Sequence, residues 1–214
     1  MAAEIPGWNF NEVRQASSDI WNQALGQIAV KGNNEKEKVK FYSALYNAHF
    51  LPRTFSDVDG SYPRFDGDGQ IMKMDHGTYY CDFSQWDTYR AVHPLFSILT
   101  PSRNGDMAHS LVLKGQQGGW LPIFPSWNSY TAAMIGDHCI AMIGDAIVKD
   151  TPGFDYEEAY TLMRKNAFEA NPDSASYRDG KGRRAMESYL KYNYVPLELS
   201  LIHISEPTRQ EAIS

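Results

Sequence analysis

The chain has 214 residues, with 20 basic and 26 acidic side chains and a formal net charge of −6 at pH 7. This balance argues against a nucleic-acid platform, which needs a basic excess. An apolar share of 43% with only 16 glycines and 11 prolines excludes collagen-like and disordered chains. No run approaches the ~18 apolar residues of a membrane span. We therefore expect a globular chain without a membrane span.

Two helices and a long loop are expected first. Apolar residues recur at three- and four-residue steps over 11–30, the pattern of an amphipathic helix. Asn33 and Asn34 can cap a second helix, which ends before Pro52. Residues 54–80 are rich in aspartate, glycine and aromatic residues and have no helical period. They predict a long loop with at most short strands.

The remainder of the chain predicts further helices. A kink is expected at Pro94, the segment 120–127 is expected to be extended and aromatic, and the helix over 129–149 is apolar on most sides, which predicts burial. We therefore predict an all-α fold of helical hairpins joined by long aromatic loops. The expected helices cover 84–99, 104–113, 129–149, 155–171 and, more weakly, 182–194. Asn104 is expected to cap the helix over 104–113, and Asp155, in a capping box with Glu158, the helix over 155–171.

The acidic loop does not match a calcium-binding motif. The EF-hand loop needs glycine at its sixth position, and counting from Asp57 gives Tyr62. We therefore assign ordinary turn and capping roles to its four aspartates, Asp57, Asp59, Asp66 and Asp68.

The histidines and cysteines indicate no metal or nucleophile site. Cys139 has no neighbouring base that would lower its pKa, so a buried structural role is expected, and no bridge to Cys81 can be inferred from spacing. No phosphate-binding glycine loop or nucleophile-elbow serine occurs. Four histidines are scattered without metal-ligand spacing, namely His49, His76, His93 and His109.

Three residues of the third expected helix lie within one turn and can converge on a ligand. Trp86, Asp87 and Arg90 supply an aromatic ring, a carboxylate and a guanidinium. A sugar needs this set, because the ring lies against its C–H face while the charged pair exchanges hydrogen bonds with its hydroxyls. The alternative needs no ligand: Asp87 completes a capping box with Ser84, and Arg90 is its partner three residues on. Both interpretations stay open here.

A second candidate group lies in the apolar helix expected over 129–149. Asp137 and His138 would be costly to bury alone, so each is expected to have a partner. His138 and Asp145 are seven residues apart and would share one face of that helix. A structural pair and a ligand-contacting pair are both compatible with this spacing.

Several segments together resemble the α-mannosidases of glycoside hydrolase family 92, in content, order and spacing. The resemblance covers about residues 1–198, and the Trp-Asp-Thr-Tyr-Arg and Gly-Asp-His strings are its most specific parts. The segments are Lys40-Phe-Tyr-Ser-Ala-Leu-Tyr to Asp57-Val-Asp-Gly, Gln85-Trp-Asp-Thr-Tyr-Arg-Ala-Val-His-Pro-Leu and Thr131-Ala-Ala-Met-Ile-Gly-Asp-His.

The resemblance implies a calcium-dependent, inverting exo-α-mannosidase that removes terminal mannose from glycans. Such an enzyme has a β-sandwich followed by an (α/α)6 toroid, and residues 1–198 would be the first half of that toroid. The catalytic acid, the base and the calcium ligands would lie downstream of residue 198, so no catalytic or metal-binding residue is assigned here. Trp86, Asp87 and Arg90 would form part of the mannose pocket, with Asp137 and His138 as further candidates.

The last residues, 199–214, depart from the family pattern and resemble translated sequencing-adapter read-through. On this interpretation the chain is a fragment that is inactive alone. Its parent would be exported to the periplasm or the extracellular space, as most members of the family are. Two other functions stay open: another toroid glycosidase, acting for instance on glucosides, and a non-catalytic glycan-binding protein.

Overall fold

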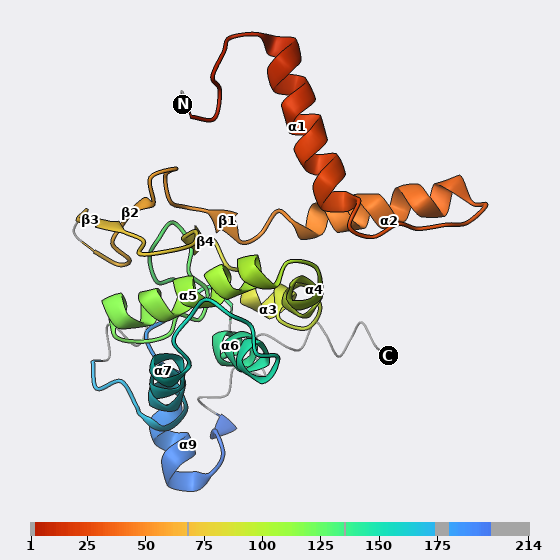
Figure 1. The fold of residues 1–214 in the computed structure, drawn as a ribbon. Coiled ribbons are helices and arrows are strands. Elements are labelled where there is room, and N and C mark those ends of the chain that lie inside the picture. Colours follow the sequence, from red (N-terminus) through yellow and green to blue (C-terminus); the bar gives the residue numbers. More distant parts are fainter. Residues whose placement is uncertain (1–2, 68, 135, 174–179, 198–214) are drawn as a thin grey trace. The chain divides into compact units, whose positions relative to one another are not determined.

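The computed structural model describes residues 3–67, 69–134, 136–173 and 180–197 (Figure 1). The chain forms two compact units, Met1–Leu51 and Pro52–Ser214. About half of the described residues are helical, in line with the predicted helical fold, and four short strands occur among them. The tail predicted over 199–214 lies outside the described residues.

The first unit is a pair of helices, α1 (Phe10–Leu25) and α2 (Glu35–Ala48). The side chain of Asn34 accepts hydrogen bonds from two backbone N–H groups of the first turn of α2, which confirms the predicted cap. The two helices meet through Trp21 and Tyr46, whose ring centroids are 4.4 Å apart. Helix α1 ends at residue 25, earlier than the periodicity to residue 30 predicts.

The second unit opens with the predicted loop and its short strands. Strand β1 (Arg53–Thr54) pairs antiparallel with β4 (Tyr80–Cys81), and β2 (Ser61–Pro63) pairs antiparallel with β3 (Ile71–Lys73). The expectation of a long loop with at most short strands is therefore confirmed.

The single helix expected over 84–99 is two helices. Helix α3 (Gln85–Thr88) is separated from α4 (Val92–Leu99) by a break in which Ala91 has a φ of −136°. The break comes before Pro94, which lies in the first turn of α4. A proline is tolerated there because the N–H it lacks would have no partner within the helix.

The helix expected over 104–113 is longer, and Asn104 does not cap it. Helix α5 (Pro101–Gly118) begins at its proline and ends before Gly119, whose φ of 87° suits glycine. Asn104 lies inside the helix, where its buried amide donates to Ser97 Oγ at 3.0 Å.

The helix expected over 129–149 begins later, at His138. Residues 126–129 instead form a tight turn closed by two backbone hydrogen bonds, and Met134 and Gly136 have φ values of 61° and 94°. Positive φ values are incompatible with a right-handed helix, so apolar composition alone led to the wrong start. Helix α6 (His138–Val148) is otherwise buried as predicted, through Cys139, Met142, Ile143 and Ala146.

Two further helices complete the second unit. Helix α7 (Tyr156–Phe168) is capped by Asp155, whose Oδ1 accepts from the Glu158 backbone N–H at 3.0 Å, as predicted. It ends at Phe168, before the expected residue 171. The weak helix expected over 182–194 is present as α9 (Met186–Tyr192).

Helix α5 lies at the centre of this unit, with the strands on one side and helices α6 and α7 on the other (Figure 1). Four polar side chains, three or four residues apart, follow one face of α5 and bind the backbone N–H or C=O groups of the aromatic loops. The pairs are Asp106 with Thr78 N, Ser110 with Tyr80 N, Lys114 with Tyr80 O, and Gln117 with Phe65 N.

Lys114 is completely buried in this face of α5. Its ammonium donates to the Tyr80 carbonyl and lies 3.6 Å from the centroid of the Tyr79 ring. Burial lowers the pKa of Lys114 to about 7. The lysine therefore satisfies loop backbone that would otherwise be buried without a partner.

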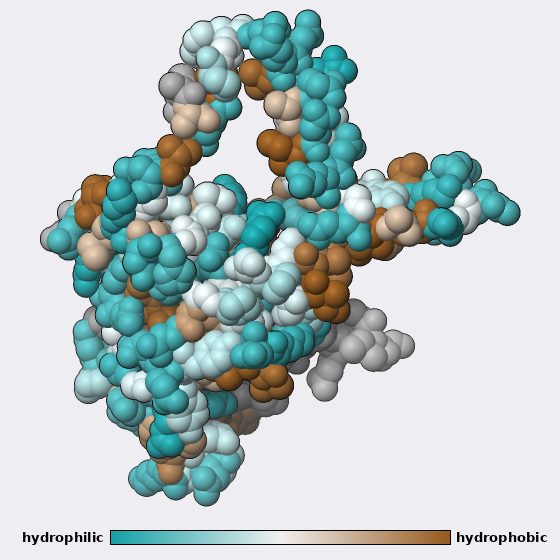
Figure 2. Space-filling view, viewed as in Figure 1, coloured by the Kyte–Doolittle hydropathy of each residue, from teal (hydrophilic) through white to brown (hydrophobic). Residues whose placement is uncertain are grey.

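On the face drawn in Figure 2, apolar side chains form separate patches among hydrophilic ones. Large apolar side chains that are strongly exposed include Ile98, Trp127 and Val148. Within the described ranges, no helix combines the length and apolar character needed to cross a membrane.

Two glycine-to-alanine substitutions test the packing of α5. In Gly105→Ala the added Cβ would collide with the Pro152 carbonyl oxygen, which belongs to backbone and cannot rotate away. We expect a loss of at least about 2 kcal/mol in unfolding free energy. The control is Gly144→Ala in α6, where the nearest atom, of Met163, is 3.5 Å away. It should be neutral or stabilising by up to about 1 kcal/mol. Urea unfolding of the chain measures both, and equal effects would contradict this packing.

Candidate functional site

The structure brings three of the predicted site residues together. The Trp86 ring on α3 and the His138 ring at the start of α6 have centroids 5.6 Å apart. The Arg90 guanidinium carbon lies 4.2 Å from the centroid of the Trp86 ring. An indole, an imidazole and a guanidinium from two separate segments therefore form one cluster.

Tyr89 belongs to the same cluster, although it was not among the predicted site residues. Its ring stacks on His138, with centroids 4.3 Å apart and planes 12° from parallel. Arg90 Nε donates to the Tyr89 hydroxyl at 2.9 Å. The signal was available, because Tyr89 is three residues from Trp86. Arg90 is thus held by two rings, which favours one orientation of its donors.

Asp87 is exposed on the same turn as Trp86, and its carboxylate accepts a hydrogen bond from the Ser84 hydroxyl. The Ser84 side chain makes no capping bond to the backbone of α3, so the predicted capping box is not formed. Within the described ranges, no ion pair joins Asp87 to Arg90. Neither part of the alternative that needed no ligand, the capping box or the pairing of Asp87 with Arg90, is therefore found among the described residues.

His138 is half-buried, and its surroundings favour the neutral form of its imidazole. Burial lowers its pKa, and the positive charge of Arg90 lowers it further. A neutral imidazole can donate through one nitrogen and accept through the other. Among the described contacts His138 does not pair with Asp145, which instead binds Lys149 Nζ at 2.7 Å, just after the end of α6.

Asp137 precedes the first residue of α6 and does not join the cluster through any hydrogen bond or ion pair among the described residues. Both of its carboxylate oxygens are buried, and neither has a hydrogen-bond partner there, contrary to expectation. Burial raises the pKa of Asp137 to about 6. The polar side chain of Asn166 and the positive charge of Arg183 act in the other direction and lower it, but burial has the larger effect. An unsatisfied buried carboxyl of this kind has unused capacity to accept hydrogen bonds.

The described residues do not fit the calcium ion that the resemblance implies. Calcium takes six to eight oxygen ligands. In the part of the chain that the structure describes, one group could hold a metal ion, formed by Asp75, His76 and His109. It offers one carboxylate and two imidazoles. Spacing along the sequence did not indicate this group, because the fold brings His76 and His109 together from a loop and a helix.

Comparison with known proteins identifies the family. The glycosyl hydrolase family 92 catalytic domain matches residues 1–214, so the chain belongs to this family. No curated protein sequence matches the chain.

Solved structures of this family have the same fold. The family GH92 α-mannosidase BT3965 from Bacteroides thetaiotaomicron is 34% identical, with a TM-score of 0.80 over 92% of this chain and 25% of that one. Its complex with mannoimidazole gives a TM-score of 0.79 at the same identity, over 92% and 24%. The inverting mannosidase BT2199 from Bacteroides thetaiotaomicron VPI-5482 is 28% identical, with a TM-score of 0.80 over 91% and 26%. The chain thus spans about a quarter of the length of these proteins.

The buried carboxyl of Asp137 makes stability depend on pH. Its folded pKa of about 6 exceeds the ordinary value of 3.8, so protonation of Asp137 favours the folded state. This stabilisation is fully present below about pH 4 and is lost as the pH rises through 6. Asp137→Asn should therefore raise the unfolding free energy at pH 7 by up to about 3 kcal/mol and change it little at pH 4.

Urea unfolding of the chain at both pH values measures this effect. Asp145→Asn, which removes a partly exposed pair with Lys149, is the control and should cost less than about 1 kcal/mol at pH 7. A destabilised Asp137→Asn variant at pH 7 would show that the carboxylate is favourably paired.

Proposed function

We propose that this chain is part of a calcium-dependent, inverting exo-α-mannosidase and supplies part of its mannose pocket. On this proposal residues 1–198 form the first half of an (α/α)6 toroid, and the longer protein is exported to the periplasm or the extracellular space. The observation that carries the proposal is the cluster of Trp86, Arg90 and His138 in a chain of family 92. The substrates would be glycans that end in α-linked mannose.

The related structures support the substrate class. BT3965 is described as an α-mannosidase and has been solved with mannoimidazole, and BT2199 is described as an inverting mannosidase. Both resemble this chain over more than nine-tenths of its length.

The chemistry of the cluster suits a terminal sugar. The Trp86 ring can pack against the C–H face of a pyranose, while the exposed carboxylate of Asp87 accepts hydrogen bonds from its hydroxyls. Arg90, held against Trp86 and Tyr89, can donate to neighbouring hydroxyl oxygens. His138, neutral at physiological pH, can serve as donor or acceptor. Because the rings are already held in place, they and the charge-assisted hydrogen bonds can orient the sugar without a large loss of side-chain conformational entropy.

These residues position the sugar and do not cleave it. Inverting hydrolysis needs a carboxylic acid that protonates the leaving oxygen and a carboxylate, about 6.5–9.5 Å away, that activates water. We place both groups, and the ligands of calcium, in parts of the longer protein outside this chain. Asp137, with its raised pKa and with carboxylate oxygens that have no hydrogen-bond partner among the described residues, is proposed as a further contact of the bound glycan.

Asp87→Ala in the longer protein tests the pocket. Loss of a charge-assisted hydrogen bond to the sugar should lower kcat/KM for an aryl α-mannoside about 10- to 100-fold. The unfolding midpoint should change little, since Asp87 is exposed. Asp59→Ala is the control, because Asp59 is an exposed turn residue whose carboxylate accepts hydrogen bonds from Ser61, and it should leave turnover unchanged.

The outcomes separate the alternatives. Unchanged turnover in Asp87→Ala would remove Asp87 from the pocket. Preferential cleavage of the matching α-glucoside by the parent protein would indicate another toroid glycosidase. Glycan binding without turnover would indicate a non-catalytic protein.

A further inference from the structure

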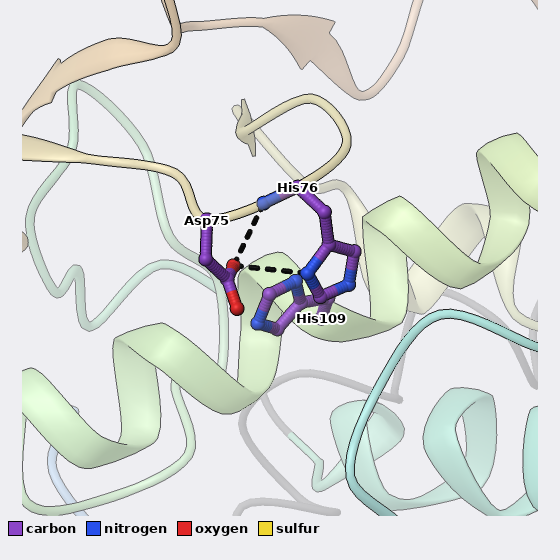
Figure 3. Close-up of side chains that lie close together, drawn as sticks. All are labelled: Asp75, His76 and His109. Carbon is purple, nitrogen blue, oxygen red and sulfur yellow. Dashed lines mark hydrogen bonds and ion pairs between the residues drawn. The ribbon is translucent and has the colours of Figure 1, made fainter.

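Asp75 and His76 lie in the turn that follows β3, and His109 lies on α5, within the same compact unit (Figure 3). The His76 and His109 rings stack with centroids 4.7 Å apart and planes 15° from parallel. One donor atom from each of the three residues lies within 4.8 Å of the others. We propose that these three side chains bind a divalent transition-metal ion of the zinc type.

The hydrogen bonds of His76 prepare one nitrogen as a ligand. Its Nε2 lies 3.0 Å from the Gly153 carbonyl, which can only accept, so Nε2 carries a proton. In the neutral imidazole Nδ1 then has a free lone pair, and it faces Asp75 Oδ1 at 3.0 Å. Two acceptors this close need a cation between them, which is either a proton or a metal. A metal-bound histidine commonly donates its other N–H to a backbone carbonyl, as here.

His109 supplies the second imidazole from a rigid helix. Its side chain is 9% exposed, and its Nδ1 is buried with no hydrogen-bond partner among the described residues. The ring lies directly beside His76 and Asp75 (Figure 3).

The turn that carries Asp75 and His76 is fixed against α5. Gly77 has a φ of 67°, and a side chain there would collide with the carboxylate of Asp106. That carboxylate accepts from the Thr78 backbone N–H at 3.1 Å. Asp106 precedes His109 by three residues, so it lies on the same face of α5. The turn that carries Asp75 and His76 is therefore held next to His109 through the Asp106 side chain, without any need for a metal.

The donor set selects the kind of metal. Two imidazole nitrogens and one carboxylate oxygen suit zinc, cobalt or nickel, whereas calcium prefers oxygen alone. Zinc would sit about 2.0–2.2 Å from each donor, so the three side chains, whose donor atoms lie within 4.8 Å of one another, would have to turn until their lone pairs converge on the metal. Three protein ligands leave a fourth position for water or an external ligand. This site does not depend on the proposed mannosidase activity.

Metal binding by the complete 214-residue chain tests the proposal directly. After chelator treatment, zinc is titrated in competition with a chromogenic chelator, and cobalt is followed by its visible absorption. We expect a saturable site that His76→Ala, Asp75→Ala and His109→Ala each weaken at least about tenfold. His49→Ala, in the first compact unit, is the matched control and should leave the affinity unchanged.

The design stays decisive if His109→Ala fails to fold, because the side chains of His76 and Asp75 are 51% and 75% exposed and can be removed with little loss of packing. Circular dichroism is used to check whether each variant is folded. Absence of saturable zinc binding, or equal zinc affinity in His76→Ala and His49→Ala, overturns the proposal.

Discussion

The polar stripe along α5, formed by Asp106, Ser110, Lys114 and Gln117, is the constraint on which the second unit depends. Each of these side chains binds loop backbone that would otherwise be buried without a partner. Unpaired backbone groups in a core cost about as much as lost hydrogen bonds. The long aromatic loop can therefore stay irregular and still pack tightly, because α5 supplies the partners that a sheet would provide.

This stripe also positions the candidate sites. Strand β4, which Ser110 and Lys114 hold through Tyr80, leads directly into α3 and so places Trp86 and Asp87. Helix α6 packs on the same central helix and brings His138 to the Trp86 ring. At the other end of the stripe, Asp106 fixes the turn that presents His76 to His109. One helix thereby relates both groups of functional side chains to a single core.

Local signals in the sequence predicted much of this arrangement. The caps at Asn34 and Asp155 follow from side chains that bind the first turn of their own helices, so no tertiary contact is needed to find them. The spacing of Trp86 and Arg90 likewise indicates that they share one turn, and their contact is found.

Other features depend on contacts between distant segments and left no local signal. The tight turn at 126–129 delays α6 in spite of a continuous apolar composition. The pairing of His76 with His109 arises because a loop folds back onto α5. That Asp137 has no hydrogen-bond partner in the part of the chain that the structure describes could not be predicted, because the sequence pattern indicates only that a buried carboxylate should have one.

A crystal structure of the longer protein with a bound mannose-shaped imidazole inhibitor would test the central claim most directly. The account predicts that the sugar ring packs against Trp86 and that its hydroxyls lie within hydrogen-bonding distance, about 2.6–3.2 Å, of Asp87 and Arg90. An inhibitor bound productively in the catalytic centre without contact to any of these three residues would contradict it.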